Sequence, residues 1–277
     1  MKNTLNCLGR LVDLSTPQIM GILNLSPDSF FDGGRYSLIE DAVIQTEKML
    51  KEGATFIDIG GQSTRPGSHR IEADEEWKRI EPVLKALTKS FPEIYISIDT
   101  YHSSVARKAV DSGACMINDI SAGSFDPAMF ETAADLRCPY ILMHMRGIPE
   151  TMQKAPVYTD VINDVTEFFR EKLDLLSDYG MHDIILDPGF GFGKTLEHNY
   201  KLLGMLDYFA LFDRPLLAGI SRKSMISKLL ECNTEETLNG TTAANTIALM
   251  KGAKLLRVHD VREARDAIKI YMKTQVA

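Results

Sequence analysis

The side chains best suited to chemistry follow short apolar segments and form two groups. The first group combines carboxylates, an amide and a flexible amine: Asp99, Asn118, Asp187 and Lys223. Paired acceptors bind a fork of N–H donors through two parallel hydrogen bonds, so this group suits a flat, N–H-rich ring. The second group supplies donors suited to phosphate oxygens: Arg65, Ser221, Arg257 and His259. A simpler reading is open for Lys223 and Arg257, which are also candidates for solvated surface charges.

A second simple reading applies to the acidic residues, because Asp and Asn often cap the helices that follow strands. This reading stays open for Asp119 and Asp126. It is weaker for Asp58, Asp99 and Asp187, since each lies within or just after an apolar run. Carboxylates that converge at one place need cationic or hydrogen-bond-donating partners.

The segment LDPGFGFGKT, residues 186–195, resembles a phosphate-binding loop but does not match one. A P-loop needs a glycine five residues before its Gly-Lys-Ser/Thr sequence, and here that position is Pro188. Proline removes a backbone N–H from a cradle that is built of such groups. The dinucleotide pattern fails as well, because Lys194 stands where its third glycine belongs. The segment therefore offers Asp187 and a glycine-rich aromatic turn.

Eight short apolar or β-branched runs are separated by segments with helical periodicity. The runs cover residues 19–23, 55–59, 94–98, 115–117, 140–143, 184–186, 215–218 and 254–258. Several helical segments end in a glycine suited to the turn into the next strand: Gly53, Gly113, Gly180 and Gly252. The alternation predicts a (β/α)8 TIM barrel over residues 1–277 as a single domain, preceded by a short β-hairpin through residues 8–14. An open doubly wound sheet is the alternative.

A barrel of this kind places its active site at the carboxyl ends of the strands. Each of the eight runs ends in, or is followed by, a polar or ligand-capable group. Those at the first, fifth and eighth runs are Asn24, His144 and Arg257 with His259. The polar groups are therefore expected to meet in one shared mouth.

Composition limits the classes of partner. A formal net charge of −7 argues against nucleic acid binding, which requires a basic surface. The four cysteines are far apart and form no C-x-x-C pair, which favours buried thiols in a reducing cytoplasm. No apolar stretch reaches the roughly 18 residues of a membrane span, and the opening residues lack the apolar core of a signal peptide. We expect a cytoplasmic protein with small-molecule ligands and neither nucleic acid nor membrane partners.

Eight segments, in order, resemble the signature segments of the bacterial dihydropteroate synthases. They are GILNLSPDSFFDGG, DIGGQSTRPG, SIDT, NDISAG, LMHMRG, DPGFGFGK, GISRKS and LRVHD, and they span residues 21–260. The resemblance implies a pterin-binding TIM barrel that acts as a homodimer with Mg²⁺. It implies condensation of 6-hydroxymethyl-7,8-dihydropterin pyrophosphate with p-aminobenzoate in folate biosynthesis, and hence a sulfonamide target.

The resemblance also implies roles for single residues. Asn24 would bind Mg²⁺. The pyrophosphate would be held by Asn24, Thr64, Arg65, Ser221, Arg257 and His259. The pterin would be held by Asp99, Asn118, Asp187, Lys223 and Arg257. Pro66, Phe190 and Ser224 would border the p-aminobenzoate site. One position departs from the family pattern: Gln62 replaces a glutamate, so no charge-dependent role is assigned to it.

The implied reaction is substitution at the exocyclic methylene of the pterin, with Asp99, Lys223 and Arg257 as the catalytic residues. Two other functions are considered: a pterin-dependent methyltransferase domain, which has no use for the anion-binding donors, and a non-catalytic pterin-binding protein. The loops of residues 24–34 and 62–72 are expected to close over the ligands, so that p-aminobenzoate binds after the pterin. A dimer surface is expected on the last two helices, through Leu238, Ile247, Leu249, Ile268 and Ile270.

Overall fold

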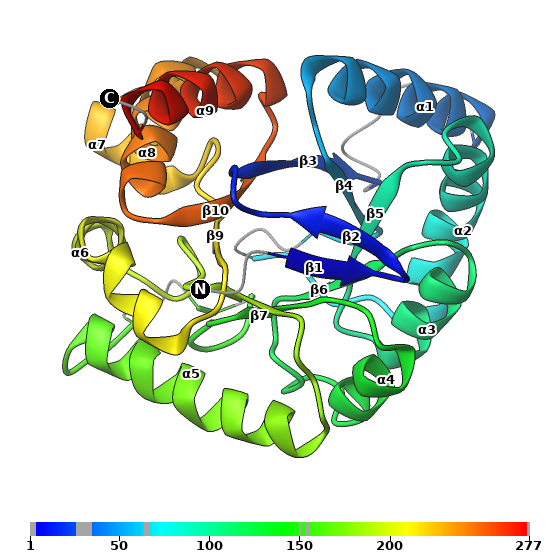
Figure 1. Cartoon of the computed structure of the whole chain (residues 1–277), viewed down its shortest axis with the longest axis horizontal. Helices are drawn as coiled ribbons and strands as arrows, with labels where there is room; N and C mark the ends of the chain where they lie inside the picture. The colour runs from blue at the N-terminus through cyan, green and yellow to red at the C-terminus, as the bar shows by residue number, and fades with distance from the viewer. Residues whose placement is uncertain (1–3, 26–34, 64–66, 150, 153–155, 276–277) are drawn as a thin grey trace.

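The strands close into a parallel barrel in the computed structural model, which describes residues 4–25, 35–63, 67–149, 151–152 and 156–275. Neighbouring strands follow the order β10-β3-β4-β5-β6-β7-β8-β9 (Figure 1). Their bounds are β3 Gln18–Asn24, β4 Phe56–Gly60, β5 Tyr95–Asp99, β6 Met116–Asp119, β7 Tyr140–Met143, β8 Ile184–Asp187, β9 Leu216–Ala218 and β10 Ala253–Val258. Each strand lies within two residues of its predicted run, so the predicted fold class is confirmed.

Helices surround the barrel (Figure 1). They are α1 Arg35–Glu52, α2 Ala73–Ser90, α3 Ser103–Asp111, α4 Met129–Leu136, α5 Val161–Asp178, α6 Leu196–Gly204, α7 Ser224–Leu230, α8 Leu238–Met250 and α9 Val261–Gln275, with the 3-10 helices η2 Leu206–Phe212 and η3 Thr234–Thr237. The four glycines predicted to end helical segments have positive φ angles, between 71° and 111°. Within the described residues, no helix combines the length and apolarity that crossing a membrane demands.

Alternate residues of each strand face opposite layers, as the period of two requires. On β4, Ile57 and Ile59 pack into the cluster between strands and helices, whereas Phe56 packs into a second cluster inside the barrel. Asp58 lies between Ile57 and Ile59 and so shares the inward side with Phe56. Polar side chains near the carboxyl ends of the strands are thereby directed toward the barrel axis.

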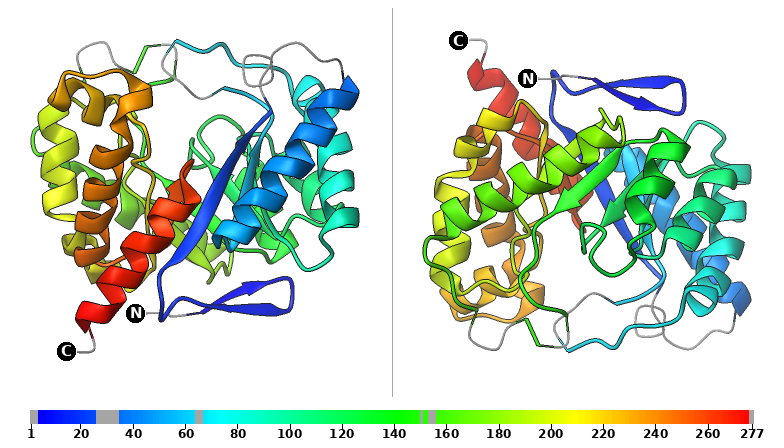
Figure 2. Two further views of the ribbon diagram at one scale, coloured as in Figure 1. Left: turned by 90° about the horizontal axis from the view of Figure 1, so that it is seen from above. Right: turned by 90° about the horizontal axis from the view of Figure 1, so that it is seen from below.

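A hairpin closes the opposite end of the barrel (Figure 2). Its strands β1 Thr4–Cys7 and β2 Arg10–Asp13 pair antiparallel. Residues 8–14 were predicted to form this hairpin, but that range covers only its turn and second strand. The turn residues Leu8 and Gly9 have φ angles of 53° and 88°, the left-handed conformation that a two-residue hairpin needs. The buried Leu5, Cys7, Val12 and Leu14 pack with inward residues of the strands and fill the barrel bottom.

Candidate active site

The guanidinium of Arg257 connects three strands at the mouth of the barrel. It extends from β10, where its Nε donates to Asp58 Oδ2 on β4 at 2.6 Å and its Nη2 donates to Asp99 Oδ2 on β5 at 2.7 Å. The Arg257 side chain is 19% exposed and the two carboxylates are buried, so the ion pairs are shielded from solvent screening. This excludes the reading of Arg257 as a solvated surface charge.

Strand register places several of the predicted side chains at one level. Asn24 pairs with Gly60, Gly60 pairs with Asp99, and Asp99 pairs with Asn118 across successive strands. A Cβ at Gly60 would lie 3.5 Å from both Asn24 Oδ1 and Asp99 Cβ, so the two side chains converge above a position without a side chain. Glycine therefore keeps the floor of the mouth open between them.

Asp58 is a central residue to which the sequence analysis gave no role. Its Oδ2 accepts from Arg257 and also from Asn118 Nδ2 at 3.0 Å. Asp58 is fully buried, and its Oδ1 has no hydrogen-bond partner among the described residues. A buried carboxylate in an apolar strand was the available signal, but its two partners come from β6 and β10 and are far away in the sequence.

Asp187 and Lys223 face each other across the far side of the mouth. Asp187 lies at the end of β8, is buried, and accepts from the Gly189 backbone N–H through Oδ1 at 2.7 Å. Lys223 follows β9, donates to the carbonyl of Phe190, and lies 4.7 Å from the ring centre of Phe192. A Cβ on Gly219 would lie 3.8 Å from Asp187 Oδ2 and 3.9 Å from Arg257 Cβ, which connects this pair to the ion-pair centre.

The charges at the mouth do not balance. Asp58, Asp99 and Asp187 face two cations at the mouth, Arg257 and Lys223, so one carboxylate is in excess. Lys194 also lies near Asp187, but burial lowers the pKa of Lys194 well below its usual value. Burial raises the pKa of Asp99 to about 7, with Arg257 opposing the shift and Asp58 adding to it. Burial lowers the pKa of Lys223 to about 8, and Asp187 opposes that shift. The site is thus prepared for a ligand rich in N–H donors or carrying positive charge.

Two of the predicted phosphate donors lie together at the ends of β9 and β10. Ser221 Oγ is 3.1 Å from His259 Nδ1 and accepts from the His259 backbone N–H at 3.2 Å. Arg222 binds both oxygens of Asp260 at 2.9 and 2.6 Å, which ties the two loops together. The structure therefore brings Ser221 and His259 together, while Thr64, Arg65 and Pro66 lie outside the described residues.

The residues predicted to border the p-aminobenzoate site differ in how deeply they are buried. Phe190 is fully buried and packs in the main core, and its place at the border of the p-aminobenzoate site stays a prediction. Phe192 is only partly buried and is the ring that lies beside Lys223. Gly191, between the two rings, has a positive φ angle of 81°. Ser224 is exposed as the first residue of α7, and its role stays a prediction.

Asp119 and Asp126 have the structural role that the sequence left open. Asp119 accepts from the backbone N–H groups of Ser121 and Gly123 at 2.7 and 2.8 Å. Asp126 accepts from Ser103 N at 2.7 Å and thereby holds the start of α3. These two carboxylates stabilise the loops that surround the mouth and are not free to bind a ligand.

Gln62 has a structural explanation. Its Nε2 donates to Glu76 Oε1 at 2.9 Å, and its Oε1 accepts from the Tyr101 hydroxyl at 2.5 Å. Glu76 is fully buried, and burial raises its pKa to about 7, opposed by hydrogen bonds from Thr100 and Gln62. A glutamate at position 62 would place a second carboxylate against the first, so the amide avoids a like-charge pair in the interior.

The residues present suit a magnesium ion that takes most of its ligands from substrate and water. Asn24 offers an amide oxygen at the mouth. Among the described residues, no cluster of three or more His, Cys, Asp or Glu side chains could hold a metal. Mg²⁺ commonly uses one or two protein oxygens together with phosphate and waters, so this sparse donor set fits it.

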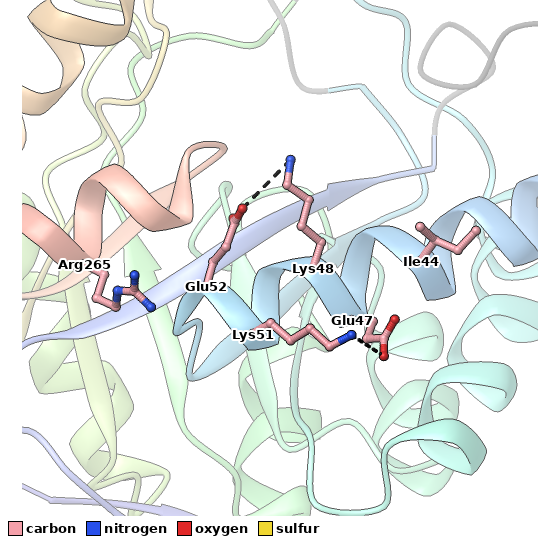
Figure 3. Close-up of a pocket in the computed structure, with 6 residues that line it drawn as sticks. All are labelled: Ile44, Glu47, Lys48, Lys51, Glu52 and Arg265. Atoms are coloured by element: carbon pink, nitrogen blue, oxygen red, sulfur yellow. Dashed lines mark ion pairs between the residues drawn. The ribbon is translucent and has the colours of Figure 1, made fainter.

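A hollow elsewhere on the molecule is unrelated to the mouth. It lies on the outer helical layer between α1 and α9 (Figure 3) and is lined by Ile44, Glu47, Lys48, Lys51, Glu52 and Arg265. Its lysines are paired along α1, Lys51 with Glu47 at 2.7 Å and Lys48 with Glu52 at 4.0 Å. These i,i+4 pairs are typical of a solvated helix surface.

Comparison with known proteins identifies the family of this site. Residues 20–259 match the family described as "Pterin binding enzyme". Dihydropteroate synthase of Escherichia coli (strain K12) is 46% identical over 268 residues, which cover 96% of this chain and 94% of the relative. The chain belongs to the dihydropteroate synthase family. The resemblance seen in the eight sequence segments is therefore confirmed, and with it the transferase class.

Solved structures of the family agree over the whole chain. The Yersinia pestis dihydropteroate synthase in a sulfonamide drug complex matches with a TM-score of 0.93 and 43% identity, covering 99% of this chain and 100% of that one. The Xanthomonas albilineans dihydropteroate synthase in complex with 7,8-dihydropteroate matches with a TM-score of 0.89 and 37% identity, covering 99% of each chain.

The ion-pair centre generates a stability prediction. Asp58→Ala would leave Arg257 and Asn118 without a shared acceptor, and removing one partner of a buried pair should lower the free energy of unfolding by roughly 3–5 kcal/mol. Glu81→Ala removes an exposed pair with Lys85 on α2 (37% and 65% exposed) and should cost less than about 1 kcal/mol. Urea denaturation measures both. Equal losses in the two variants would contradict the central place given to Asp58.

Proposed function

We propose that the protein joins 6-hydroxymethyl-7,8-dihydropterin pyrophosphate to p-aminobenzoate and releases pyrophosphate, a step of folate biosynthesis. The observation that carries the proposal is the excess negative charge around Arg257 at the mouth of the barrel. Membership of the dihydropteroate synthase family supports it. So does the family structure that holds 7,8-dihydropteroate, a molecule that combines the two substrates.

The acceptors at the mouth suit the pterin ring. Asp187, Asn118 and Asp99 offer carboxylate and amide oxygens to the amino and N–H groups of the ring. Lys223 offers a donor from the opposite edge, and Phe192 beside it gives an apolar face. We propose that Phe192, which lies beside Lys223, borders the p-aminobenzoate site together with the predicted Phe190, Ser224 and Pro66.

The proposed reaction breaks the bond between the exocyclic methylene carbon and the pyrophosphate oxygen. The aniline nitrogen forms the new C–N bond, and the resulting anilinium releases its proton to water. Because an anilinium is acidic, no strong general base is required. Positive charge develops on the pterin as the bond breaks, and the ionised Asp99 is placed to stabilise it. Arg257, Ser221 and His259 supply donors for the negative charge on the departing pyrophosphate.

We further propose that Mg²⁺ binds at Asn24 together with the pyrophosphate, where it would add Lewis-acid stabilisation of the leaving group. The amide oxygen of Asn24 fits a hard cation, and its position over Gly60 places it beside Asp99. The proposed closure of residues 24–34 and 62–72 lies mostly outside the described residues. Cytoplasmic localisation and the absence of nucleic acid and membrane partners remain predictions.

We propose a homodimer through one face of the outer layer. Exposed apolar side chains gather on η2, α7 and α8. They are 44% to 71% exposed and belong to Tyr208, Leu211, Leu229, Leu230, Ile247 and Met250. Helices α6, α7 and α8 lie side by side in Figure 1. Two residues predicted for this surface, Leu249 and Ile268, are instead buried in the core.

The reaction and its metal requirement are tested in one assay. Purified protein with Mg²⁺, pterin pyrophosphate and p-aminobenzoate should form dihydropteroate. A chelator should stop turnover and added Mg²⁺ should restore it, because the metal acts on the pyrophosphate. Binding of a pterin without pyrophosphate, followed by calorimetry, should be unaffected by the chelator. Absence of product in complete mixtures would refute the function, and full activity in the chelator would refute the metal site.

The pH dependence of kcat/KM follows from the shifted pKa values of Asp99 and Lys223. Asp99 must lose its proton to stabilise positive charge, so activity should rise as pH increases through about 7. Lys223 must keep its proton to donate, so activity should fall as pH passes about 8. The profile should be bell-shaped with a narrow maximum between these values. Asp99→Asn should be far less active and should lack the acidic limb, whereas an unchanged acidic limb would assign it to another group.

The dimer surface is tested by charge insertion. Leu229→Asp places a carboxylate on the proposed interface and should shift the protein from dimer to monomer in sedimentation velocity, because an unpaired charge is costly in an apolar contact. Ile44→Asp changes an exposed apolar residue on α1 (64% exposed, against 53% for Leu229) and should leave the dimer intact. A monomeric wild-type protein, or a dimer retained by Leu229→Asp, would overturn this surface.

A further inference from the structure

Lys194 is a buried amine that the proposed reaction does not use. It is 2% exposed, and its Nζ lies among four acceptors. These are His144 Nδ1 at 2.9 Å, His144 O at 3.2 Å, Gly189 O at 2.9 Å and Phe192 O at 3.1 Å. Carbonyl oxygens only accept, so the amine donates to three backbone groups that have converged on it.

The imidazole of His144 is adapted to the same contact. Burial, reinforced by Lys194 and Arg146, lowers the pKa of His144 well below its usual value. A neutral imidazole carries one hydrogen; with that hydrogen on Nε2, its Nδ1 is a fourth acceptor, and the amine shares at most three hydrogens among the four. The amine therefore joins the end of β7 to the loop that follows β8.

The backbone of the loop after β8 approaches the end of β7 closely, which explains why the Lys194 amine is needed between them. A Cβ at Gly189 would lie 1.9 Å from the His144 carbonyl oxygen, and one at Gly193 would lie 2.1 Å from that of Arg146. Both glycines have positive φ, 69° and 62°, so only glycine fits these positions readily. Residues 189–193 are thus pressed against residues 144–146, and Lys194 satisfies the carbonyls that this approach buries.

The joined loop carries the groups that hold Lys223. The Phe190 carbonyl accepts from Lys223 Nζ, and the Phe192 ring lies 4.7 Å from it. A Cβ at Gly191 would lie 3.2 Å from Lys223 Cδ, so the loop also packs against the stem of this side chain. Each contact depends on the backbone path that Lys194 fixes.

We infer that Lys194 is a positioning residue for the aromatic amine substrate: it fixes the 189–193 loop so that Phe192 and Lys223 form one wall of that site. The inference rests on the proposed function. Lys194 acts through the loop, because its Nζ is directed at the carbonyls of Gly189, Phe192 and His144. A space-filling role is insufficient, because an apolar side chain of similar size would take a donor away from the His144 and Phe192 carbonyls.

Lys194→Ala removes the amine and leaves a cavity that an added small amine can enter. The KM for p-aminobenzoate should rise by roughly tenfold or more, which corresponds to the loss of hydrogen bonds to buried groups. The KM for pterin pyrophosphate should change less: Asp187 and Lys223 contact the loop, but Asp99, Asn118 and Arg257 lie on other strands and keep their places. Lys201→Met, which changes an exposed lysine of α6, is the matched control and should behave as the wild type.

Chemical rescue separates this role from a general loss of stability. Propylammonium replaces the atoms that the alanine variant lacks, so it should lower the KM for p-aminobenzoate toward the wild-type value and raise the melting temperature of Lys194→Ala. Tetramethylammonium has the same charge but no N–H, and it should do neither. The melting temperature does not depend on turnover. The contacts that Lys194 makes with the loop can therefore be tested even if the proposed reaction fails in the wild type. An unchanged KM in Lys194→Ala, or a defect that propylammonium does not relieve, would overturn the inference.

Discussion

The interaction on which the site depends is the contact of one guanidinium with two buried carboxylates. Arg257 binds Asp58 and Asp99 from across the barrel, and Asn118 shares Asp58 with it. Desolvating three charges is expensive, and the cost is offset only when the hydrogen bonds are nearly complete. Asp187 and Lys223 extend the centre, and the sum of charges stays negative. An excess of negative charge held by a rigid barrel is suited to a substrate that becomes cationic as it reacts.

The barrel supplies this arrangement through strand register. Asn24, Gly60, Asp99 and Asn118 occupy successive strands at one level. The strands are short and enclosed by helices on one side and by the hairpin below, so their ends cannot move independently. Loops complete the site, and three sets of interactions hold them. These are the Arg222–Asp260 ion pair, the hydrogen bonds that Asp119 accepts, and the hydrogen bonds of the buried Lys194 amine. Rigid strands therefore carry the charges, and clamped loops carry the donors and the aromatic wall.

Much of this could be predicted from sequence, because a barrel strand leaves two local signals. An apolar run marks the strand, and the polar residue that ends it marks the mouth, which located Asp99, Asn118, Asp187 and Arg257. Contacts between distant segments left no such signal. The partners of Asp58 and the network of Gln62 depend on which strands become neighbours and how far side chains reach.

The aromatic loop left less signal for a different reason. Phe190 and Phe192 are separated by one residue and resemble each other in sequence, yet Phe190 is fully buried and Phe192 only partly buried. Lys194 had no predicted role, and it is buried among carbonyls whose approach only the folded loop creates. The predicted hairpin is confirmed, but residues 8–14 left out its first strand, Thr4–Cys7.

The central claim is that the site around Arg257 holds one carboxylate more than the cations beside it, and that burial together with the neighbouring Asp58 raises the pKa of Asp99 to about 7. The direct measurement is a titration of the aspartate side-chain carboxyl carbons by nuclear magnetic resonance in wild type and Asp99→Asn. The account predicts one buried aspartate that titrates at about 7 in the wild type and whose signal is missing from the variant. If every aspartate in the unliganded wild type titrated near its ordinary value of about 4, the proposed charge imbalance would be contradicted.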